Sequence, residues 1–322
     1  MIRYNWTMAE IKNLYQTSLL ELISKAHIIH AQFHKSGEVQ VCTIISFKTG
    51  GCPEDCRYCA QSSYNQTSVK AQSMMSYEEV LNEAKKAKGL GATRVCLGAA
   101  WREVRDGRQF DEVLRMVKGI AELGVEVCCT LGMLKGKQAK KLKEAGLYAY
   151  NHNLDSSEKY YKTVVTTRNY QDRLDTLDII QEAGLSVCCG GILGIGESFE
   201  DRLELLQTLA VRQPHPESVP INRLEVMPGI PFGSKPKVSA WELVRIIAIA
   251  RILMPKAMIR LSAGRREMTF EEQTLCFFAG ANSVHLGEKL LTVGNQPVSK
   301  DEELFQLLGI KKRPAYLQVR EK

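Results

Sequence analysis

Three closely spaced cysteines, Cys52, Cys56 and Cys59, are the residues of this chain whose types and spacing most clearly indicate chemistry. A tetrahedral metal ion or a cubane iron–sulfur cluster normally takes four protein ligands. This segment offers three, with no histidine and no fourth cysteine close by. Three thiolates on a cubane leave one iron open to a small molecule. The spacing therefore indicates a catalytic cluster rather than a structural one.

Other cysteines lie inside short apolar runs that are typical of β-strands: Cys42, Cys96, Cys128 and Cys188. A single scattered cysteine is usually a small buried apolar side chain. Four of them in separate strands weaken that interpretation, because alternate residues of neighbouring strands can face one interior and hold a second iron–sulfur cluster. Cys129 and Cys189 each follow one of these candidates and should point to the opposite face, so packing is expected for them and for Cys276.

Polar side chains follow another strand-like run. The amides of Asn151 and Asn153 offer both donors and acceptors and suit a ureido or ribose group. Asp155 can accept hydrogen bonds from ribose hydroxyls, as acidic residues after strands do in nucleotide sites. The alternative for Asp155 is an N-cap of a helix that begins near Ser157. His152 is expected to face away from the two asparagines.

A glycine-rich segment, 190–197, closes a further strand, and its glycines are predicted to let a ligand approach the backbone closely. It is not a dinucleotide-binding fingerprint, because Phe199 occupies the position of the third glycine. The chain carries neither a G-x-S-x-G nucleophile elbow nor a phosphate-cradling P-loop, so hydrolase and kinase functions lack support.

These residues lie on a repeating unit of capped helix, glycine and apolar strand. Strand-like runs occur near residues 42, 96, 128, 149, 188, 222, 260 and 284. Strands that alternate with helices form a parallel sheet. Eight such units between residues 41 and 287 favour an α/β fold with a closed (β/α)8 TIM-type barrel, whose active site lies at the C-terminal ends of the strands. The loop that carries Cys52 begins at such an end.

The predicted organisation has three parts: an N-terminal helical extension at 1–36, the barrel at 37–300 and a short C-terminal appendage at 301–322. The capping box Thr7–Glu10 opens a helix of the extension, and the boxes Ser76–Glu79 and Ser239–Glu242 open helices of the barrel. No linker rich in proline, glycine or serine divides the chain.

Composition limits the possible classes. The chain has 322 residues, of which 44% are hydrophobic and 25% charged, as in a globular protein. We expect no membrane span, because no run of about 18 apolar residues occurs, and no secretory signal. Ten cysteines in a chain of this kind favour metal or redox chemistry over disulfides, and a cytoplasmic location. The net charge of +7 is attributed to solvated helix faces rather than to nucleic-acid binding.

The three-cysteine loop after the first strand resembles that of the radical S-adenosylmethionine enzymes. The resemblance implies a [4Fe–4S] cluster on Cys52, Cys56 and Cys59, whose open iron chelates the amino and carboxylate groups of S-adenosylmethionine. One electron from the cluster then cleaves the sulfonium and gives a 5′-deoxyadenosyl radical. Tyr58, the aromatic residue before the last cysteine, is implied to lie beside the adenine.

Further motifs narrow the resemblance to the biotin synthase family, over about residues 35 to 310. They are the segments 48–56, 97–101, 150–155, 220–222 and 260–265. The resemblance implies that dethiobiotin receives one sulfur between two unactivated carbons, at the cost of two S-adenosylmethionine molecules. The sulfur comes from an auxiliary cluster, [2Fe–2S] in familiar members, which is consumed and must be rebuilt.

The same resemblance assigns roles to single residues. The auxiliary ligands it implies are Cys96, Cys128, Cys188 and Arg260, although a guanidinium stays protonated and is a poor metal ligand on physical grounds. The alternative for Arg260 is a structural role, in which its guanidinium pairs with a carboxylate. The residues implied to contact S-adenosylmethionine are Asn153, Asp155 and Arg173, with Arg173 on its carboxylate. Those implied to hold the ureido ring of dethiobiotin are Asn151, Asn153 and Asn222.

One position departs from the family, because familiar members carry serine where this chain has Cys42. A thiolate there could add a ligand or a bridge, and four thiolates are enough for a four-iron cluster. We therefore hypothesise an auxiliary cluster larger than [2Fe–2S]. The alternative is a small buried thiol in place of serine. The family also implies a homodimer and an electron donor such as flavodoxin or ferredoxin.

Two other functions stay open at this point. A different radical S-adenosylmethionine barrel, such as a maturase or a thiamine-pathway lyase, would share the three-cysteine loop but not the paired asparagine sites and the thiolates on four strands. A zinc-bearing nucleic-acid-binding protein is the alternative from another class, suggested by the charge of +7.

Overall fold

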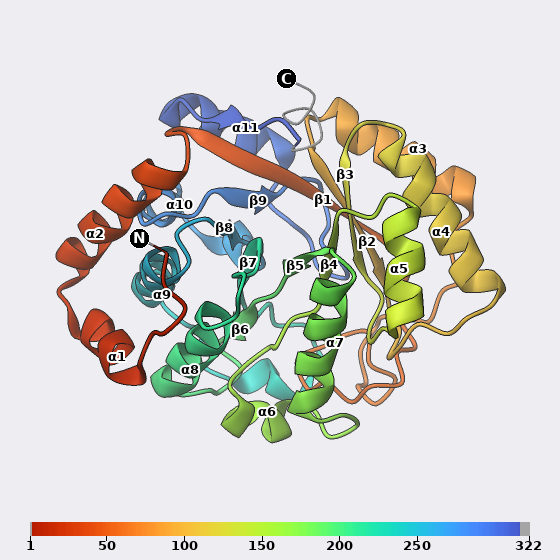
Figure 1. The fold of residues 1–322 in the computed structure, drawn as a ribbon, viewed down its shortest axis with the longest axis horizontal. Coiled ribbons are helices and arrows are strands. Elements are labelled where there is room, and N and C mark those ends of the chain that lie inside the picture. Colours follow the sequence, from red (N-terminus) through yellow and green to blue (C-terminus); the bar gives the residue numbers. More distant parts are fainter. Residues whose placement is uncertain (1, 316–322) are drawn as a thin grey trace.

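The computed structural model describes residues 2–315 and contains a closed barrel of parallel strands (Figure 1). In order around the barrel these are β1 (Glu38–Lys48), β2 (Arg94–Ala99), β3 (Glu126–Thr130), β4 (Ala149–Asn151), β5 (Ser186–Cys188), β7 (Ser218–Arg223), β8 (Met258–Leu261) and β9 (Ser283–His285). β9 pairs with β1 and closes the ring. The predicted (β/α)8 barrel is confirmed, with a strand at each of the eight expected positions.

The glycine-rich segment has a different role from the one predicted. After β5 the chain resumes as β6 (Gly191–Leu193), which pairs with β7. A Cβ atom on Gly190 would lie 1.9 Å from the carbonyl oxygen of Pro220, and one on Gly191 would lie 2.9 Å from the carbonyl oxygen of Asp155. The space beside these glycines is filled by neighbouring backbone and, at Gly191, also by a Leu205 methyl group 2.2 Å from the Cβ position, so the expectation of ligand approach at Gly190 and Gly191 is wrong.

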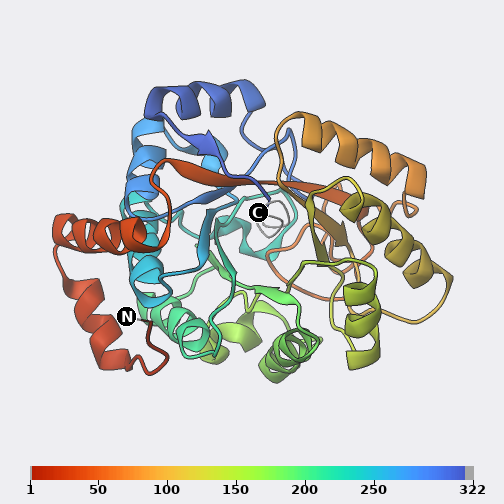
Figure 2. The ribbon, with the colours of Figure 1, turned by 45° about the horizontal axis from the view of Figure 1, so that its top comes forward.

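Helices surround the strands in both views (Figures 1 and 2). Those that follow the strands are α3 (Tyr77–Gly89), α4 (Arg108–Ala121), α5 (Gly136–Glu144), α6 (Glu158–Val164), α7 (Tyr170–Glu182), α8 (Phe199–Ala210), α9 (Ala240–Leu253), α10 (Phe270–Phe278) and α11 (Val298–Leu308). Two short 3₁₀ turns, Pro231–Ser234 and Arg265–Glu267, lie between them. The predicted capping boxes at Thr7 and Ser76 are present, and the Ser239 side chain caps α9.

Both ends of the described chain pack on the barrel. At the N-terminal end, α1 (Met8–Gln16) and α2 (Leu19–Phe33) lie along α8 and α9 (Figure 1). At the other end, β10 (Lys311–Lys312) pairs with the start of β1. Residues 316–322 of the predicted C-terminal appendage lie outside the described residues, and the three-part division stays a prediction. Among residues 2–315, no helix is both long enough and apolar enough to cross a lipid bilayer.

Alternation along the strands separates two kinds of interior. Residues such as Val95 and Val127 point outward and form the apolar core between strands and helices. The residues next to them point inward, where the N-terminal end of the barrel carries an ion network: the Arg94 guanidinium lies 2.6 Å from Glu126 and 2.9 Å from Glu217. Arg94 is fully buried, so its charge depends on these carboxylates.

Loss of this guanidinium should destabilise the barrel. Arg94→Met removes the cation while Glu126 stays buried, and breaking a buried pair from one side costs about 3 to 5 kcal/mol. We expect urea denaturation to report a loss of that size. The matched control is Lys86→Met, which removes an exposed ion pair with Glu83 and should cost at most about 1 kcal/mol. Equal losses in the two variants would contradict this account of the network.

Candidate active site

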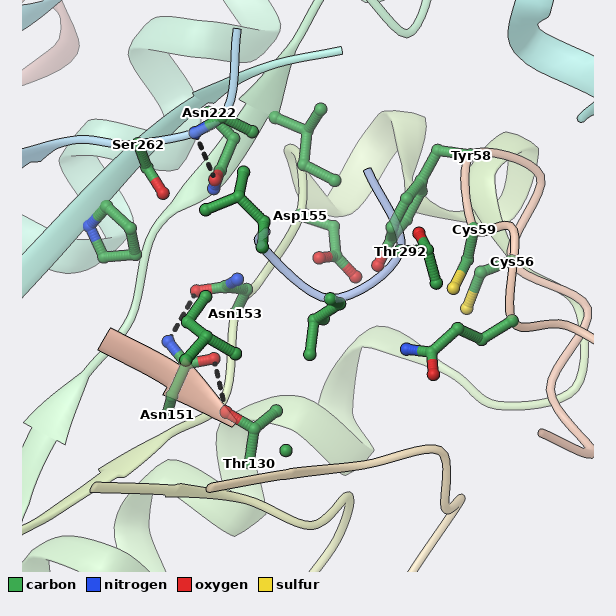
Figure 3. Close-up of a pocket in the computed structure, with 18 of the residues that line it drawn as sticks. Cys56, Tyr58, Cys59, Thr130, Asn151, Asn153, Asp155, Asn222, Ser262 and Thr292 are labelled. Carbon is green, nitrogen blue, oxygen red and sulfur yellow. Dashed lines mark hydrogen bonds between the residues drawn. The ribbon is translucent and has the colours of Figure 1, made fainter. Parts of the chain in front are cut away.

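A cavity of about 330 Å³ lies at the C-terminal end of the barrel. Its lining comes from the loop after β1, from the ends of the strands and from the loop 290–293 that follows β9. Figure 3 shows the Cys56 and Cys59 sulfurs at one end of this cavity and Asn151, Asn153 and Asn222 at the other. The candidate residues for a cofactor and those for a substrate therefore share one space.

The three-cysteine loop is held by its own backbone and by one asparagine. The Asn65 side chain donates hydrogen bonds to the carbonyl oxygens of Cys56 (3.0 Å) and Cys59 (2.8 Å). The backbone of Cys52 accepts from Ser63 N (2.9 Å), which ties the two ends of the loop together. These hydrogen bonds satisfy the backbone carbonyl groups within the loop. All three cysteines of the loop line the cavity, and none forms a disulfide.

Charged residues adjoin these cysteines. Arg173 NH2 lies 3.0 Å from Asp155 Oδ2. Arg168, which sequence analysis did not single out, reaches the same oxygen at 3.7 Å, donates to Cys56 Sγ at 3.2 Å and pairs with the buried Glu54 at 3.2 Å. A guanidinium beside a thiol favours its ionised form. The pair of arginines at 168 and 173, at the start of α7, is the sequence signal that could have revealed Arg168.

The backbone of Asp155 is in a conformation that side-chain-bearing residues rarely adopt. Its φ of 67° lies in the left-handed region, where it costs energy for a residue other than glycine. The N-cap of α6 is Ser157, whose Oγ accepts from Tyr160 N at 3.0 Å, so the alternative role of Asp155 as that cap is wrong. Instead the strained turn holds the carboxylate against Arg173. His152 is among the residues that line the cavity, and Arg173 NH1 lies 3.2 Å from its ring nitrogens.

Asn151 and Asn153 are hydrogen-bonded to each other beside the inner thiols, and Asn222 is held separately. Asn151 Nδ2 donates to Asn153 Oδ1 (3.2 Å) and lies 3.2 Å from Cys188 Sγ, while its Oδ1 accepts from Thr130 (3.2 Å) (Figure 3). Asn222 lines the cavity from β7, donates to Gly191 O (3.0 Å) and accepts from Ala263 N (3.4 Å). These contacts fix the amide orientations before any ligand arrives.

The inward cysteines of the strands meet in one buried group that contains Cys42, Cys96, Cys128 and Cys188. Cys129 and Cys189 belong to the outer apolar core, as the alternation predicts, and so does Cys276. Thiol contacts run from Cys42 to Cys96, to Cys128 and to Cys188. A hydrogen bond from Cys128 lowers the pKa of Cys188, and Arg260 and Asn151 act in the same direction, whereas burial opposes them.

Arg260 contacts this group from the side nearer the N-terminal end of the barrel. It is held there by a polar network that sequence analysis did not predict. Its Nε donates to Ser283 Oγ (2.9 Å), its NH2 to Gln40 Oε1 (3.2 Å) and its NH1 to Cys188 Sγ (3.6 Å). Cys42 donates to the same Gln40 oxygen at 3.6 Å. Strand alternation could have revealed this network. Gln40 precedes the inward Cys42 by two residues and Ser283 precedes the inward His285 by two, so both should face the same interior.

The donor sets fit iron–sulfur clusters rather than a single ion. Within residues 2–315, no three His, Cys, Asp or Glu side chains converge on one point as a lone metal ion requires. The ligands of an iron–sulfur cluster are divided among its iron atoms, one on each iron in a [4Fe–4S] cluster and two on each in a [2Fe–2S] cluster, so separated thiols are suitable for it. Burial raises the pKa of Cys56 to about 11 and that of Cys59 to about 12, so cluster assembly must displace their protons.

Two family models match the chain. The Radical SAM superfamily matches residues 46–209, and the Biotin and Thiamin Synthesis associated domain matches residues 220–311. The biotin synthase of Cytophaga hutchinsonii is 56% identical over 315 residues, which cover 98% of this chain and 94% of that protein. The biotin synthase of Nostoc punctiforme is 55% identical over 317 residues, which cover 97% of this chain and 95% of that protein.

Two solved structures share the fold. Methylornithine synthase (PylB) superposes with a TM-score of 0.79 at 20% identity, over 99% of this chain and 96% of that one. HydG, a maturase of the [FeFe]-hydrogenase, superposes with a TM-score of 0.83 at 17% identity, over 98% of this chain and 74% of that one. At these identities the likeness concerns the barrel alone.

The geometry of the three-cysteine loop generates a test of Asn65. Asn65→Ala removes two hydrogen bonds, worth about 1 kcal/mol each, and should raise the population of an opened loop roughly thirtyfold. We expect faster limited proteolysis between residues 50 and 66 in the metal-free chain, and less iron retained after anaerobic reconstitution. The control Asn82→Ala, on the exposed face of α3, should change neither. Unchanged proteolysis in Asn65→Ala would contradict this role.

Proposed function

The chain belongs to the biotin synthase family, and we propose that it inserts one sulfur atom into dethiobiotin to form biotin. The observation that carries this proposal is a single cavity lined by the three-cysteine loop, by the asparagines and by Cys96 and Cys128, the two inner cysteines that reach it. A radical generated at the loop can then reach a substrate that already lies against the source of sulfur.

The residues of the loop would hold a [4Fe–4S] cluster through Cys52, Cys56 and Cys59. When bound, the clusters supply the electron that cleaves S-adenosylmethionine and the sulfur that the product retains. The polypeptide itself orients the bound molecules and excludes water from them. The loop 290–293 covers the cavity, and Gly98 approaches it closely: a Cβ there would lie 2.8 Å from Leu291.

S-adenosylmethionine would bind between the loop and α7. Asp155, Arg173 and Tyr58 line the cavity together with Asn153, which is hydrogen-bonded to Asn151. We propose that Arg173 binds the cofactor carboxylate and that Asp155 accepts hydrogen bonds from the ribose hydroxyls. The ion pair between the two side chains holds each of them in position for its ligand. Tyr58 would lie against the adenine. Arg168, beside Cys56 Sγ, would favour the thiolate that the cluster requires.

Dethiobiotin would place its ureido ring among Asn151, Asn153 and Asn222. A ureido group offers two N–H donors and one acceptor, and amide side chains can satisfy both kinds. The contact of Asn151 with both Asn153 and Cys188 supports this position, since it connects the ring site with the inner thiols. A substrate held there has its carbon chain close to the sulfur that it must receive.

The auxiliary cluster would be held by Cys96, Cys128 and Cys188. We propose Arg260 as the remaining ligand of a [2Fe–2S] cluster, on the strength of the family motif. A four-iron cluster with Cys42 as an added thiolate is the second candidate. The continuous run of thiols from Cys42 to Cys188 favours it. Catalytic roles for Arg260 and the three loop cysteines follow from these assignments.

Further proposals rest on the family resemblance alone. They are a flavodoxin or ferredoxin as electron donor, a homodimer, and a cytoplasmic location. The radical step needs one electron from such a donor, because no side chain of the cavity can supply it.

Anaerobic turnover tests the assigned activity. With reductant, S-adenosylmethionine and dethiobiotin, we expect biotin and 5′-deoxyadenosine, measured by mass spectrometry. Cys56→Ala should abolish both products, whereas Cys188→Ala should abolish biotin and leave 5′-deoxyadenosine. Cys276→Ala, in the outer core, is the matched control and should form both. Formation of 5′-deoxyadenosine without biotin by the unaltered chain would refute the substrate and spare the radical mechanism.

Mössbauer spectroscopy distinguishes the two auxiliary clusters. If Cys42 is a ligand, the spectrum of the reconstituted chain should contain a second four-iron component, and Cys42→Ser should remove or convert it. A [2Fe–2S] component that is identical in both proteins would exclude Cys42 from the ligand set. Far-ultraviolet circular dichroism would verify that the variant retains its fold.

A further inference from the structure

His285, the last residue of β9, lies at the floor of the cavity beside the inner thiols. It stands opposite Cys42 in the register of β9 and β1. Ser283, two residues earlier, points inward and accepts a hydrogen bond from Arg260, so the alternation of the strand directs His285 to the same interior one level higher. The carbonyl oxygen of His285 accepts from Arg265 (3.1 Å) and Asn295 (2.9 Å), which fixes its backbone.

The imidazole of His285 is buried with an unsatisfied nitrogen. The residue is only 7% exposed, and within residues 2–315 its Nδ1 has no hydrogen-bond partner. Buried polar groups are nearly always paired, so an orphan of this kind indicates a partner that the polypeptide does not supply. The residue lines the same cavity as Cys96 and Arg260, so that cavity is the space in which its ring can meet a ligand.

The electrostatic surroundings agree with this position. Burial first and the Arg260 guanidinium second lower the pKa of His285 to about 3, against the opposing effect of Cys96. His285 is therefore close enough to Cys96 and Arg260 for each to influence its charge. A neutral imidazole carries one N–H donor and one acceptor nitrogen.

We propose that the imidazole of His285 donates an N–H hydrogen bond to a sulfur atom of the auxiliary cluster and thereby raises the reduction potential of that cluster. The inference rests on the proposed function, because the cluster is part of it. Reduction adds negative charge that spreads over the sulfurs, and an N–H group directed at them stabilises the reduced form. His285 is thus a positioning and tuning residue, outside the ligand set assigned above.

Other buried orphan nitrogens do not share these neighbours. His30 Nδ1 is also unpartnered among the described residues, but His30 lies on α2, outside the barrel and away from the cavity. The contrast makes His30 a matched control, because its removal perturbs a buried histidine of equal exposure without touching the inner thiols.

The experiment is an anaerobic potentiometric titration of the reconstituted full chain, with the auxiliary signals assigned in a Cys56→Ala background. We expect His285→Phe to lower the equilibrium constant for one-electron reduction of the auxiliary cluster about tenfold, equivalent to about 59 mV. His285→Asn, whose amide keeps an N–H donor at this position, should restore most of the potential. His30→Phe should leave it unchanged.

Pulsed electron paramagnetic resonance of the unaltered chain supplies a readout that needs no variant. Weak coupling of the reduced auxiliary cluster to an exchangeable proton and to ¹⁵N-labelled histidine would support the hydrogen bond, and His285→Asn should remove the nitrogen coupling. Strong coupling, as in direct ligation, or none at all would overturn it. Equal potentials in the unaltered chain and His285→Phe, at equal iron content, would also overturn it. Failure of the unaltered chain to assemble any auxiliary cluster would instead refute the proposed function.

Discussion

Closure of the sheet between β1 and β9 is the constraint on which the rest of the structure depends. The register of these strands sets Gln40 opposite Ser283 and Cys42 opposite His285. Residues near the two ends of the chain thereby enter the same interior, and Arg260 contacts both Gln40 and Ser283. A shift of β9 by one residue would turn Ser283 and His285 to the outer face, away from Gln40 and Cys42. The register therefore determines the composition of the site as well as the shape of the barrel.

The interior is graded along the barrel axis, and the gradation follows from what a buried group requires. At the N-terminal end, Arg94 satisfies two carboxylates. Above it, Gln40 and Ser283 hold the guanidinium of Arg260 toward the thiols. Higher still, amides and the loop cysteines line the cavity. Each level supplies hydrogen-bond partners to the next, so a cation can remain in a low-dielectric interior where an unpaired charge would be costly.

Much of this could be predicted from the sequence, because strands, helix caps and alternation are local signals. The eight strand positions and the separation of Cys128 from Cys129 follow from a period of two. Contacts between distant segments have no such signal. Only the folded chain brings Arg168 to Cys56, or turns Asp155 into the left-handed region beside Arg173.

The glycine-rich segment at 190–197 gives a case in which the sequence carried a local signal but did not identify the contact behind it. A glycine in a strand indicates that something approaches closely, but the sequence does not say what. The approaching group at Gly190 is the backbone of Pro220, a residue of β7. The prediction identified the correct physical requirement and the wrong neighbour. The glycine indicated that another group comes close to the backbone, whereas the closure of the barrel determined that this group is Pro220.

The two candidate clusters differ in the kind of support that the chain gives them. The loop cysteines depend on a few contacts such as those of Asn65, within a segment that has little regular structure. The inner cysteines stand on separate strands, each fixed by the ladder of the barrel. A cluster that gives up its sulfur must be rebuilt on the same ligands. Thiols held by strands keep their spacing when the cluster is gone, because the ladder and the network around Arg260 need no iron to persist. A consumable cluster is therefore better placed inside the barrel than on a loop, and the loop is suited to a cluster that must adapt to an incoming cofactor.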